Sequence, residues 1–447
     1  RRDLRRRDHP ALAAASEDGP VLPLYVADPR AAEVSAVRWK GLAGVLEELR
    51  ESYDGALVVR VGDPARVVPQ VALEVGASAV HVTPDFTPGG IRVDEQVGAA
   101  LGTVPLIATD SAYAITPGGV RTRQGTPYRV FTPFLRAWRE HGWPPPQPDA
   151  GGVRFVRGVE SEELPPGPEA DVVPEPAGEA SALARWASFL DDGLERYATE
   201  RDRPDLDGTS QLSAALRWGS VHPRTLLADL ARHRGAGAEK FIAELAWREF
   251  YADVLAHEPA SGWADLNPLP GLRYDREDDP EVALRIEAWR EGRTGFPLVD
   301  AGMRQLLATG WMHNRVRMVV ASFLVKDLHV WWPIGAAHFR THLADYDLAS
   351  NSHGWQWVAG TGTDAAPYFR VFNPLAQGLK FDPAGDYVRR WVPELRHLAG
   401  DWAHEPWRAA DGYRCGYARP IVDHADERAE ALARYEFSRR VAREGAS

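Results

Sequence analysis

The strongest constraint on the fold is a change of pattern around residues 142–180. Nine prolines lie between Pro144 and Pro176, among glycines and acidic residues. Proline fixes the backbone φ angle and has no N–H group to donate, so such a segment cannot form a helix or a central strand. The sequence therefore predicts a long surface linker that separates two parts of different architecture.

The first 110 residues alternate short apolar runs with amphipathic stretches. The runs typical of buried strands are Val21–Ala27, Ala56–Val61, Ala79–Val82 and Val104–Ile107, and Trp39–Ser52 and Arg66–Val75 are typical of helices between them. This alternation favours an α/β domain built on a doubly wound parallel sheet. Such a sheet opens with a strand, whereas the sequence begins directly at Arg1. We therefore expect that a first strand and a few residues are missing before Arg1.

From residue 181 onward, the apolar residues recur with helical spacing. The clearest helical stretches are Ala182–Ala198, Thr209–Trp218, Arg224–Arg232, Ala238–Leu255, Glu281–Glu291, Val299–Thr309, Asn314–Asp327, Ile334–Leu343 and Glu427–Glu444. We therefore predict an α/β domain over residues 1–125, a linker over residues 126–180 and an all-α domain over residues 181–447.

Composition excludes several classes of protein. With 447 residues, 44% of them hydrophobic, the chain can bury a large core and is not intrinsically disordered. Cys415 is the only cysteine, which excludes a disulfide framework or a thiolate metal cluster and predicts a cytoplasmic protein. No apolar run reaches about 18 residues, so we expect no membrane span. The net charge of −11 means that any surface for a nucleic acid must be a local patch.

Two short motifs point to phosphate or to a cofactor. Thr209–Ser213 is predicted to begin a helix, where hydroxyl groups cap free N–H groups and where phosphate is attracted. Simple capping is the commoner role of such residues. Gly360–Ala365 has the form G-x-G-x-x-A, but it follows a helical region rather than a strand, so we reject a dinucleotide-binding fold there. A glycine turn close to some cofactor remains an alternative.

Tryptophans and polar side chains concentrate in the helical part. Of the 16 tryptophans, 13 follow residue 180, which on its own predicts a large aromatic core. Spacings of three and four place on one helix face Glu244, Trp247, Arg248 and Tyr251. Further cations, amides and carboxylates lie in Trp311–Met318 and Asp345–Trp355. Each group alone is more commonly structural, but together they indicate a ligand on which these side chains stack or to which they bond.

Several of these residues belong to stretches that resemble one known family. The matching stretches are Arg1–Arg5, Val130–Phe134, Gly208–Ser213, Trp247–Tyr251, Gly310–Met318, Ala321–Leu328, Gly354–Arg370 and Phe372–Pro374. They extend from the first residue to Pro374, and the run from Trp355 to Phe372 is too specific for chance. The chain resembles the photolyase/cryptochrome family, and in particular the class I photolyases that repair cyclobutane pyrimidine dimers in DNA.

The resemblance implies a U-shaped FAD in the helical domain. The residues implied to contact it are Tyr197, Thr209, Ser210, Gln211, Leu212, Ser213, Phe241, Arg248, Arg317, Asp345, Asp347 and Asn351. Family members often carry arginine at the place of Gln211, so one phosphate cation is expected to be absent. Arg317 and Asp345 are expected to form a buried pair that tunes the isoalloxazine rather than stabilising the fold. The neutral amide of Asn351 is expected to face flavin N5, where it suits an anionic reduced flavin.

The resemblance also implies a pocket for a flipped lesion. Trp247 and Trp357 are expected to sandwich the dimer, and Glu244 is expected to hydrogen-bond its pyrimidine edge. Desolvation next to tryptophan would raise the pKa of the Glu244 carboxyl and let it donate. The remaining residues on this side are Asn314, Arg315 and Met318, with Arg315 at the DNA backbone.

Two further functions follow from the resemblance. Trp355 and Trp332 match the inner and middle members of an electron relay that reduces the flavin in light, and Tyr274 is the nearest aromatic for the outer member. The amino-terminal domain is expected to hold an antenna pigment. Residues 85–90 depart from the folate-binding pattern, so an 8-hydroxy-5-deazaflavin with contacts to Asp28 and Asp85 is expected rather than methenyltetrahydrofolate. The absence of any antenna is an alternative.

The sequence therefore predicts a monomeric, light-driven carbon–carbon lyase without a metal. Reduced FAD would donate an electron to the dimer, the cyclobutane ring would split, and the electron would return. Three alternatives remain. One is a cryptochrome photoreceptor, and another is a (6-4) photoproduct photolyase, whose chemistry uses a histidine pair where this chain has only His313 beside Asn314. The third is a flavin-storing or DNA-binding protein without activity.

Overall fold

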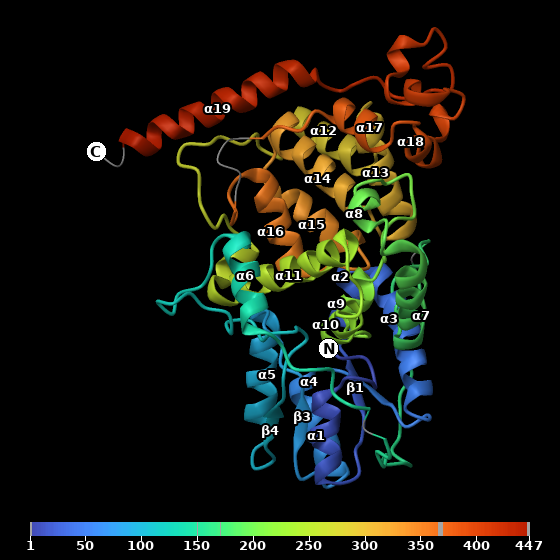
Figure 1. The fold of residues 1–447 in the computed structure, drawn as a ribbon, viewed down its shortest axis with the longest axis vertical. Coiled ribbons are helices and arrows are strands. Elements are labelled where there is room, and N and C mark those ends of the chain that lie inside the picture. Colours follow the sequence, from blue (N-terminus) through green and yellow to red (C-terminus); the bar gives the residue numbers. More distant parts are fainter. Residues whose placement is uncertain (1, 150, 170, 365–369, 445–447) are drawn as a thin grey trace. The chain divides into compact units, whose positions relative to one another are not determined.

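The computed structural model describes residues 2–149, 151–169, 171–364 and 370–444 (Figure 1). Arg1 and residues 365–369, which belong to stretches singled out above, lie outside the described residues. The chain divides into two compact units. The first unit comprises Arg1–Ala198, Ser210–Pro259 and Ala344–Ala349, and the second comprises Thr199–Thr209, Ala260–Leu343 and Ser350–Ser447.

The first unit contains four short parallel strands. β1 (Leu24–Ala27) pairs with β2 (Val58–Val61), and β3 (Val80–Val82) pairs with β4 (Leu106–Ala108). The first three strands lie inside the runs that predict them, and β4 extends one residue beyond its run. The predicted α/β class is confirmed, with the strands arranged as two two-stranded sheets among the described residues.

Helices alternate with these strands and continue beyond them in the first unit. They are α1 (Pro10–Asp18), α2 (Arg30–Val34), α3 (Ala36–Ser52), α4 (Pro64–Glu74), α5 (Pro88–Ala100), α6 (Phe131–His141), α7 (Glu179–Ser188), α9 (Ser213–Trp218), α10 (Pro223–Leu230) and α11 (Ala236–His257). Helix α8 (Tyr197–Glu200) is a single turn. Helices α1, α2, α5 and α6 lie outside the predicted helical stretches, and in α5 the residues Pro88, Gly89 and Gly90 are typical of turns. Thr87 nevertheless caps it, since its hydroxyl accepts a hydrogen bond from the Gly90 N–H at 3.2 Å.

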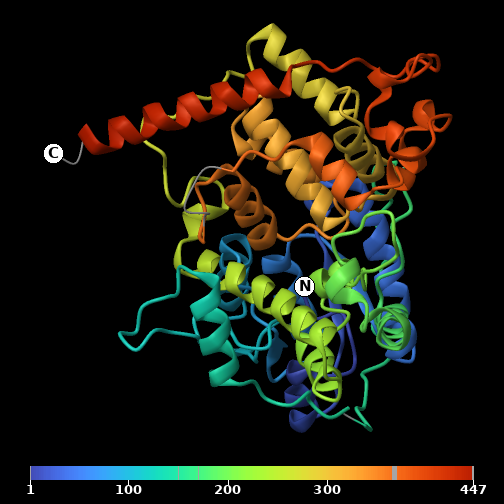
Figure 2. The same cartoon turned by 45° about the horizontal axis from the view of Figure 1, so that its top comes forward.

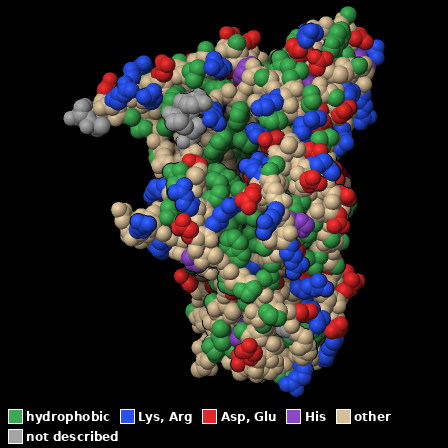
Figure 3. All heavy atoms as spheres, in the orientation of Figure 1, with side chains coloured by type: hydrophobic (Ala, Val, Ile, Leu, Met, Phe, Trp, Pro, Cys, Tyr) green, Lys and Arg blue, Asp and Glu red, His purple; other side chains and the backbone are tan. Residues whose placement is uncertain are grey.

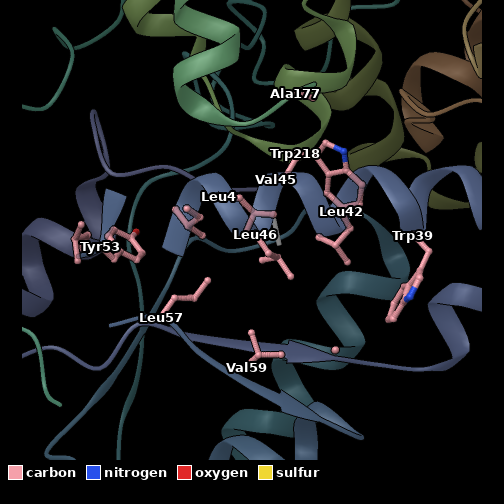
Figure 4. Close-up of a cluster of buried hydrophobic side chains, with 13 residues drawn as sticks. Leu4, Trp39, Leu42, Val45, Leu46, Tyr53, Leu57, Val59, Ala177 and Trp218 are labelled. Carbon is pink, nitrogen blue, oxygen red and sulfur yellow. The ribbon is translucent and has the colours of Figure 1, made fainter. Parts of the chain in front are cut away.

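One face of α3 forms a hydrophobic core with β2 (Figure 4). Leu42, Leu46 and Leu49 recur at spacings of three and four, and all three are buried together with Val59 of β2. Trp218, the last residue of α9, packs into the same cluster. The amphipathic pattern that predicts α3 therefore corresponds to a real packing face.

The second unit is helical among its described residues. Its helices are α12 (Pro280–Arg290), α13 (Pro297–Thr309), α14 (Asn314–Ser322), α15 (Trp332–His342), most of α16 (Leu348–Ala359), α17 (Pro374–Phe381), α18 (Asp386–Trp391) and α19 (His424–Glu444). A π-helical turn over Phe323–Asp327 extends α14. The long helix α19 (Figure 2) begins against this turn, where His424 Nδ1 lies 2.5 Å from Asp327 Oδ1.

The proline-rich segment carries no helix or named strand among the described residues of 142–178. Its described residues form an isolated parallel bridge between Val21 and Phe155, and the Glu162 N–H donates to the Val59 carbonyl oxygen of β2 at 2.8 Å. The absence of regular elements agrees with the prediction from proline content, while the domain bounds of 1–125, 126–180 and 181–447 stay a prediction.

Charge is dispersed on the face drawn in Figure 3, where basic and acidic side chains are interspersed over the surface.

No described helix has both the length and the apolar character that a membrane crossing requires. Among the described residues, no group of three or more histidine, cysteine, aspartate and glutamate side chains is arranged to hold a metal ion.

Candidate functional site

The segment Thr209–Ser213 does not form the helix start that its hydroxyls predict. Helix α9 begins only at Ser213, and no side chain caps it. The backbone of Gln211 has a φ angle of 49°, in the left-handed region that a right-handed helix cannot contain. The prediction of a helix from Thr209 is therefore wrong. Ser210 and Leu212 are buried, whereas Ser213 is exposed.

A cation stands beside Gln211. The Nη1 atom of Arg185, on α7, donates to Gln211 Oε1 at 3.5 Å, and its Nη2 lies 3.1 Å from a carboxylate oxygen of Glu175. The sequence shows no arginine at position 211 itself. The fold thus supplies a guanidinium next to that position from 26 residues upstream, and no local motif could have revealed it.

Aromatic side chains pack closely around Tyr197 and Phe241. Both are buried, and their ring centroids are 5.3 Å apart. Phe189 contacts both rings, and Trp186 packs against Phe241 at 5.1 Å. These residues come from α7, α8, α11 and the turn after α7, so this cluster joins those elements.

One face of α11 carries the predicted lesion-contacting residues. The Glu244 carboxylate lies 3.2 Å from Lys240 Nζ, one helical turn away. The Trp247 indole stacks on Phe131 with a centroid distance of 3.7 Å. The Arg248 guanidinium donates to two backbone carbonyl oxygens, those of Ala112 and Leu216, each at 3.2 Å. This part of α11 therefore presents a carboxylate and, about one turn further on, a flat indole and a fixed cation.

The segment around Asp345 and Asp347 lies in a charged, poorly hydrated environment. Arg2 and Asp347 form an ion pair in which each side chain is 11% exposed. Burial lowers the pKa of Arg2, but the charges of Asp347 and its neighbours outweigh burial and the net pKa is raised. Arg217 donates to the Tyr346 carbonyl oxygen at 3.0 Å, and burial together with the charge of Arg2 lowers its pKa to about 10. Asp345 is buried as well.

Asp28 and Asp85 both follow the carboxyl ends of strands. Asp28 comes directly after β1 and is held by Arg30, whose Nη2 lies 2.6 Å from Asp28 Oδ2. Asp85 follows β3 and accepts a hydrogen bond from the Thr87 N–H at 2.8 Å. In open α/β folds ligands bind at this end of the strands. The two strands belong to different two-stranded sheets, so the geometry alone does not join the two carboxylates into one site.

The start of α14 presents Asn314, Arg315 and Met318 in the second unit. His313 precedes the helix, and its Nδ1 accepts a hydrogen bond from the Arg315 N–H at 3.2 Å. Burial lowers the pKa of His313 to about 4, so the ring is neutral and acts as a cap. Asn314 is exposed, and Met318 is half-buried.

Two arginines of α14 have different environments. Arg315 Nη2 lies 3.0 Å from Asp202 Oδ2, and its guanidinium covers the ring of Phe381 at 4.5 Å. Its Nε is buried and has no hydrogen-bond partner among the described residues. Arg317 donates from Nε to the Met312 carbonyl oxygen at 2.8 Å. The pairing of Arg317 with Asp345 stays a prediction.

Helix α16 carries three of the predicted residues. Asn351 Nδ2 donates to the Ala336 carbonyl oxygen at 3.2 Å, which fixes the orientation of its amide. Trp355 is buried, and its indole N–H has no hydrogen-bond partner among the described residues. Trp357, two residues further, is half-buried.

Trp332 has a carboxylate partner that the sequence did not reveal. It is the first residue of α15, is 1% exposed, and donates from Nε1 to Asp265 Oδ1 at 2.7 Å. The hydroxyl of Tyr274 is buried without a hydrogen-bond partner among the described residues. Burial raises the pKa of Tyr274, and the nearby charge of Asp265 raises it further. Asp265 belongs to no motif, and only the fold brings it to Trp332.

Comparisons with known proteins identify the family. The family model described as "FAD binding domain of DNA photolyase" matches residues 241–437, and the model described as "DNA photolyase" matches residues 1–150. A relative from Escherichia coli (strain K12), named "Deoxyribodipyrimidine photo-lyase", is 38% identical, and the match covers 98% of each chain.

Solved structures give the same result. A class III photolyase from Agrobacterium tumefaciens has a TM-score of 0.88 and 36% identity, over 98% of this chain and 96% of that one. A cryptochrome from Synechocystis sp. PCC6803 also reaches 0.88, with 28% identity over 97% of each chain. The expected fold, an amino-terminal α/β domain with a helical FAD-binding domain, is therefore confirmed, and the chain belongs to the photolyase/cryptochrome family.

Proposed function

We propose that this protein repairs cyclobutane pyrimidine dimers in DNA in a light-dependent reaction with FAD as its cofactor. The observation that carries the proposal is the nearly full-length match to a relative named deoxyribodipyrimidine photo-lyase. The cryptochrome neighbour has the same fold at lower identity, so the fold alone does not separate repair from photoreception. Four residues match the pattern that the resemblance implies for repair, and this favours repair over photoreception. They are Glu244 on α11, Asn314 and Met318 on α14, and Asn351 on α16.

The residues present fit FAD. The indole N–H of Trp355 is buried and unpartnered, as expected where a polar edge of a ligand is to accept it. Arg185 beside Gln211 supplies a cation suited to a phosphate group, in the place where the sequence lacks one. The residues proposed to hold the cofactor are Tyr197, Thr209, Ser210, Gln211, Leu212, Ser213, Phe241, Arg248, Arg317, Asp345, Asp347 and Asn351, joined by Arg185.

Reduced FAD, when bound, supplies one electron to the lesion under light and receives it back after the ring has split. The protein's own residues bind and orient the dimer. Trp247, fixed by Phe131, and Trp357 offer flat surfaces for the two bases, and Glu244 offers a hydrogen-bonding carboxyl to the pyrimidine edge. Asn314 and Met318 are proposed to contact the lesion as well, and Arg315 is proposed to contact the DNA backbone.

The amide of Asn351 is proposed to face the flavin. Its donation to the Ala336 carbonyl oxygen sets which way the amide points. Because an amide does not ionise, it supplies no proton to the cofactor at that position. We also propose Trp355, Trp332 and Tyr274 as the electron relay, with Tyr274 as the outer member.

The antenna is proposed to be an 8-hydroxy-5-deazaflavin near Asp28 and Asp85. The support is the position of both carboxylates after the carboxyl ends of strands. An absorption spectrum of the purified protein tests this: a second chromophore adds a band separate from those of oxidised flavin. The protein is further proposed to act as a monomer in the cytoplasm, where a single cysteine needs no oxidising environment.

Repair of (6-4) photoproducts is disfavoured by the state of His313. That histidine is buried, its Nδ1 is engaged as a helix cap, and burial lowers its pKa to about 4. A protonated imidazolium is therefore not available at this position near neutral pH. The experiment that tests the function offers both lesions in parallel oligonucleotides, under blue light and in the dark, to the reduced protein. Loss of only the cyclobutane dimer, and only in light, supports the proposal.

A further inference from the structure

Three buried tryptophans of the second unit differ in what their indole N–H groups meet. The Trp355 ring packs against the Trp289 ring, with centroids 6.1 Å apart. It also packs on Gly335, one helical turn from Trp332, because a Cβ atom added at Gly335 would lie 2.2 Å from Trp355 Cη2. Trp289 is therefore in ring contact with Trp355, and Trp332 lies one helical turn from the glycine on which the Trp355 ring packs.

The N–H partners distinguish these tryptophans. The Trp355 N–H has no partner among the described residues, and the Trp289 N–H donates to the Val320 carbonyl oxygen at 3.0 Å. Only the Trp332 N–H, of the three, donates to a carboxylate, Asp265 Oδ1 at 2.7 Å. A neutral carbonyl oxygen is a very weak base, whereas a carboxylate carries a full negative charge and can take a proton.

Removing one electron from an indole makes it a cation and makes its N–H group strongly acidic. A carboxylate in hydrogen-bond contact favours that cation through its charge, and it can also accept the proton. At Trp289 neither effect is available, and that residue is fully buried. Asp265 is half-buried, so a proton that it accepts can exchange with water.

We propose that Asp265 is a positioning residue that directs the electron vacancy to Trp332 rather than Trp289 and accepts the Trp332 indole proton. This inference rests on the proposed function, because the vacancy arises when light-driven reduction of FAD withdraws an electron through Trp355. Trp332 gives one electron to Trp355, the Nε1–H bond breaks, and the proton moves to Asp265 Oδ1. A neutral indolyl radical and a protonated carboxyl remain.

The cycle closes with a reductant from the medium. A diffusible thiol gives one electron to the indolyl radical, either directly or through Tyr274, and Asp265 returns the proton to Nε1. The thiol is oxidised, and two such events join two thiols in a disulfide. Without Asp265 the proton would stay on Nε1, and the tryptophan cation could regain its electron before the thiol acts.

The test is Asp265→Asn in the holoenzyme with oxidised FAD. Asparagine keeps the volume and an oxygen that accepts the hydrogen bond, but it cannot accept the proton. Time-resolved absorption after a flash reports whether the tryptophan radical is protonated. In the unchanged protein we expect a deprotonated radical whose formation slows in D₂O. In Asp265→Asn we expect a protonated radical, no such isotope effect, and a roughly tenfold lower yield of long-lived radical, which corresponds to about 1.4 kcal/mol.

Three variants complete the experiment. Asp265→Glu retains a carboxylate and is expected to restore deprotonation, which a purely structural role would not require. Trp332→Phe is expected to abolish the deprotonated radical, and Trp289→Phe to leave it unchanged. A deprotonated radical of normal yield in Asp265→Asn overturns the proposal. Repair by chemically reduced protein does not need the relay, so failure of repair there would count against the proposed function. The assignment of Asp265 is tested separately, by the protonation state and yield of the tryptophan radical.

Discussion

The indole ring of Trp247 lies face to face with the ring of Phe131, with centroids 3.7 Å apart and planes inclined by 9°. Phe131 is the first residue of α6, and Trp247 lies in the middle of α11. One face of the indole is therefore covered by protein, and the proposed function requires the other face to receive a base. Phe250 and Tyr251 contact Trp247 edge-on or at a tilt, so the ring is held in place before any ligand arrives.

Replacing Phe131 by leucine should weaken binding of dimer-containing DNA. Leucine fills the space but removes the aromatic stack, which is worth about 0.5–1.5 kcal/mol. We expect roughly a three- to tenfold higher dissociation constant, measured in the dark with an oligonucleotide that carries one dimer. The flavin content should stay unchanged, which controls for folding. An unchanged dissociation constant would show that the stack does not prepare Trp247 for the lesion.

Arg185→Ala should reduce the affinity for FAD. A charge-assisted hydrogen bond contributes about 1.5–3 kcal/mol, so we expect the dissociation constant of FAD to rise roughly tenfold or more. Adding Gln211→Arg to this variant should restore binding, because it returns a cation to the same place. Fluorescence titration of the cofactor-free protein with FAD measures both. Equal affinities in all three proteins would contradict a role for Arg185 at a phosphate.

Arg315→Gln should weaken DNA binding in a salt-dependent manner. A phosphate contact releases about one counterion, so the slope of log affinity against log salt should become less steep by about 1. The same titration on Arg66→Gln, an exposed arginine of α4 for which no role is proposed, provides the matched control. If both variants keep the slope of the unchanged protein, Arg315 does not contact the DNA backbone.

The burial of His338 should lower the free energy of unfolding of the protein in mild acid. Burial lowers its pKa to about 3, with further contributions from the charges of His342 and Arg290. The unfolded chain binds a proton at this histidine below about pH 6.5, whereas the folded chain does not until about pH 3. The free energy of unfolding therefore falls as the pH drops through this window, by about 2 kcal/mol at pH 5 from this residue.

Urea unfolding at pH 7 and pH 5 measures that loss. His338→Asn should lose about 2 kcal/mol less than the unchanged protein between the two pH values, because asparagine does not titrate. An equal loss in both proteins would mean that folding does not lower the pKa of His338.

Local patterns were sufficient for most elements of the fold. The apolar periodicity of α3 predicts its buried face, and the short apolar runs predict β1 to β4, because both patterns arise from contacts that each element makes with the core. Helix α5 escaped prediction because Pro88-Gly89-Gly90 has turn propensity, which the cap from Thr87 overrides. The wrong helix start at Thr209 has a similar cause, since the positive φ of Gln211 leaves no sequence signature.

The candidate site residues also differ in whether a local pattern indicates them. Helical spacing indicates Glu244, Trp247 and Arg248 as candidates because it places them on one face, and the family resemblance implies their roles. Asp265 lies 67 residues from Trp332, and Arg185 lies 26 residues from Gln211. Pairs at such separations depend on how the chain folds as a whole, so no motif around either residue could have indicated them.

Light-dependent repair can be measured by illuminating the chemically reduced protein with an oligonucleotide that carries one cyclobutane thymine dimer. The amount of intact dimer is then measured by chromatography, with a dark sample alongside. We expect the dimer to disappear in blue light and to persist in the dark, and Glu244→Ala to repair at least roughly tenfold more slowly. Persistence of the dimer under light, in protein that contains reduced FAD and binds the oligonucleotide, would contradict the proposed repair activity.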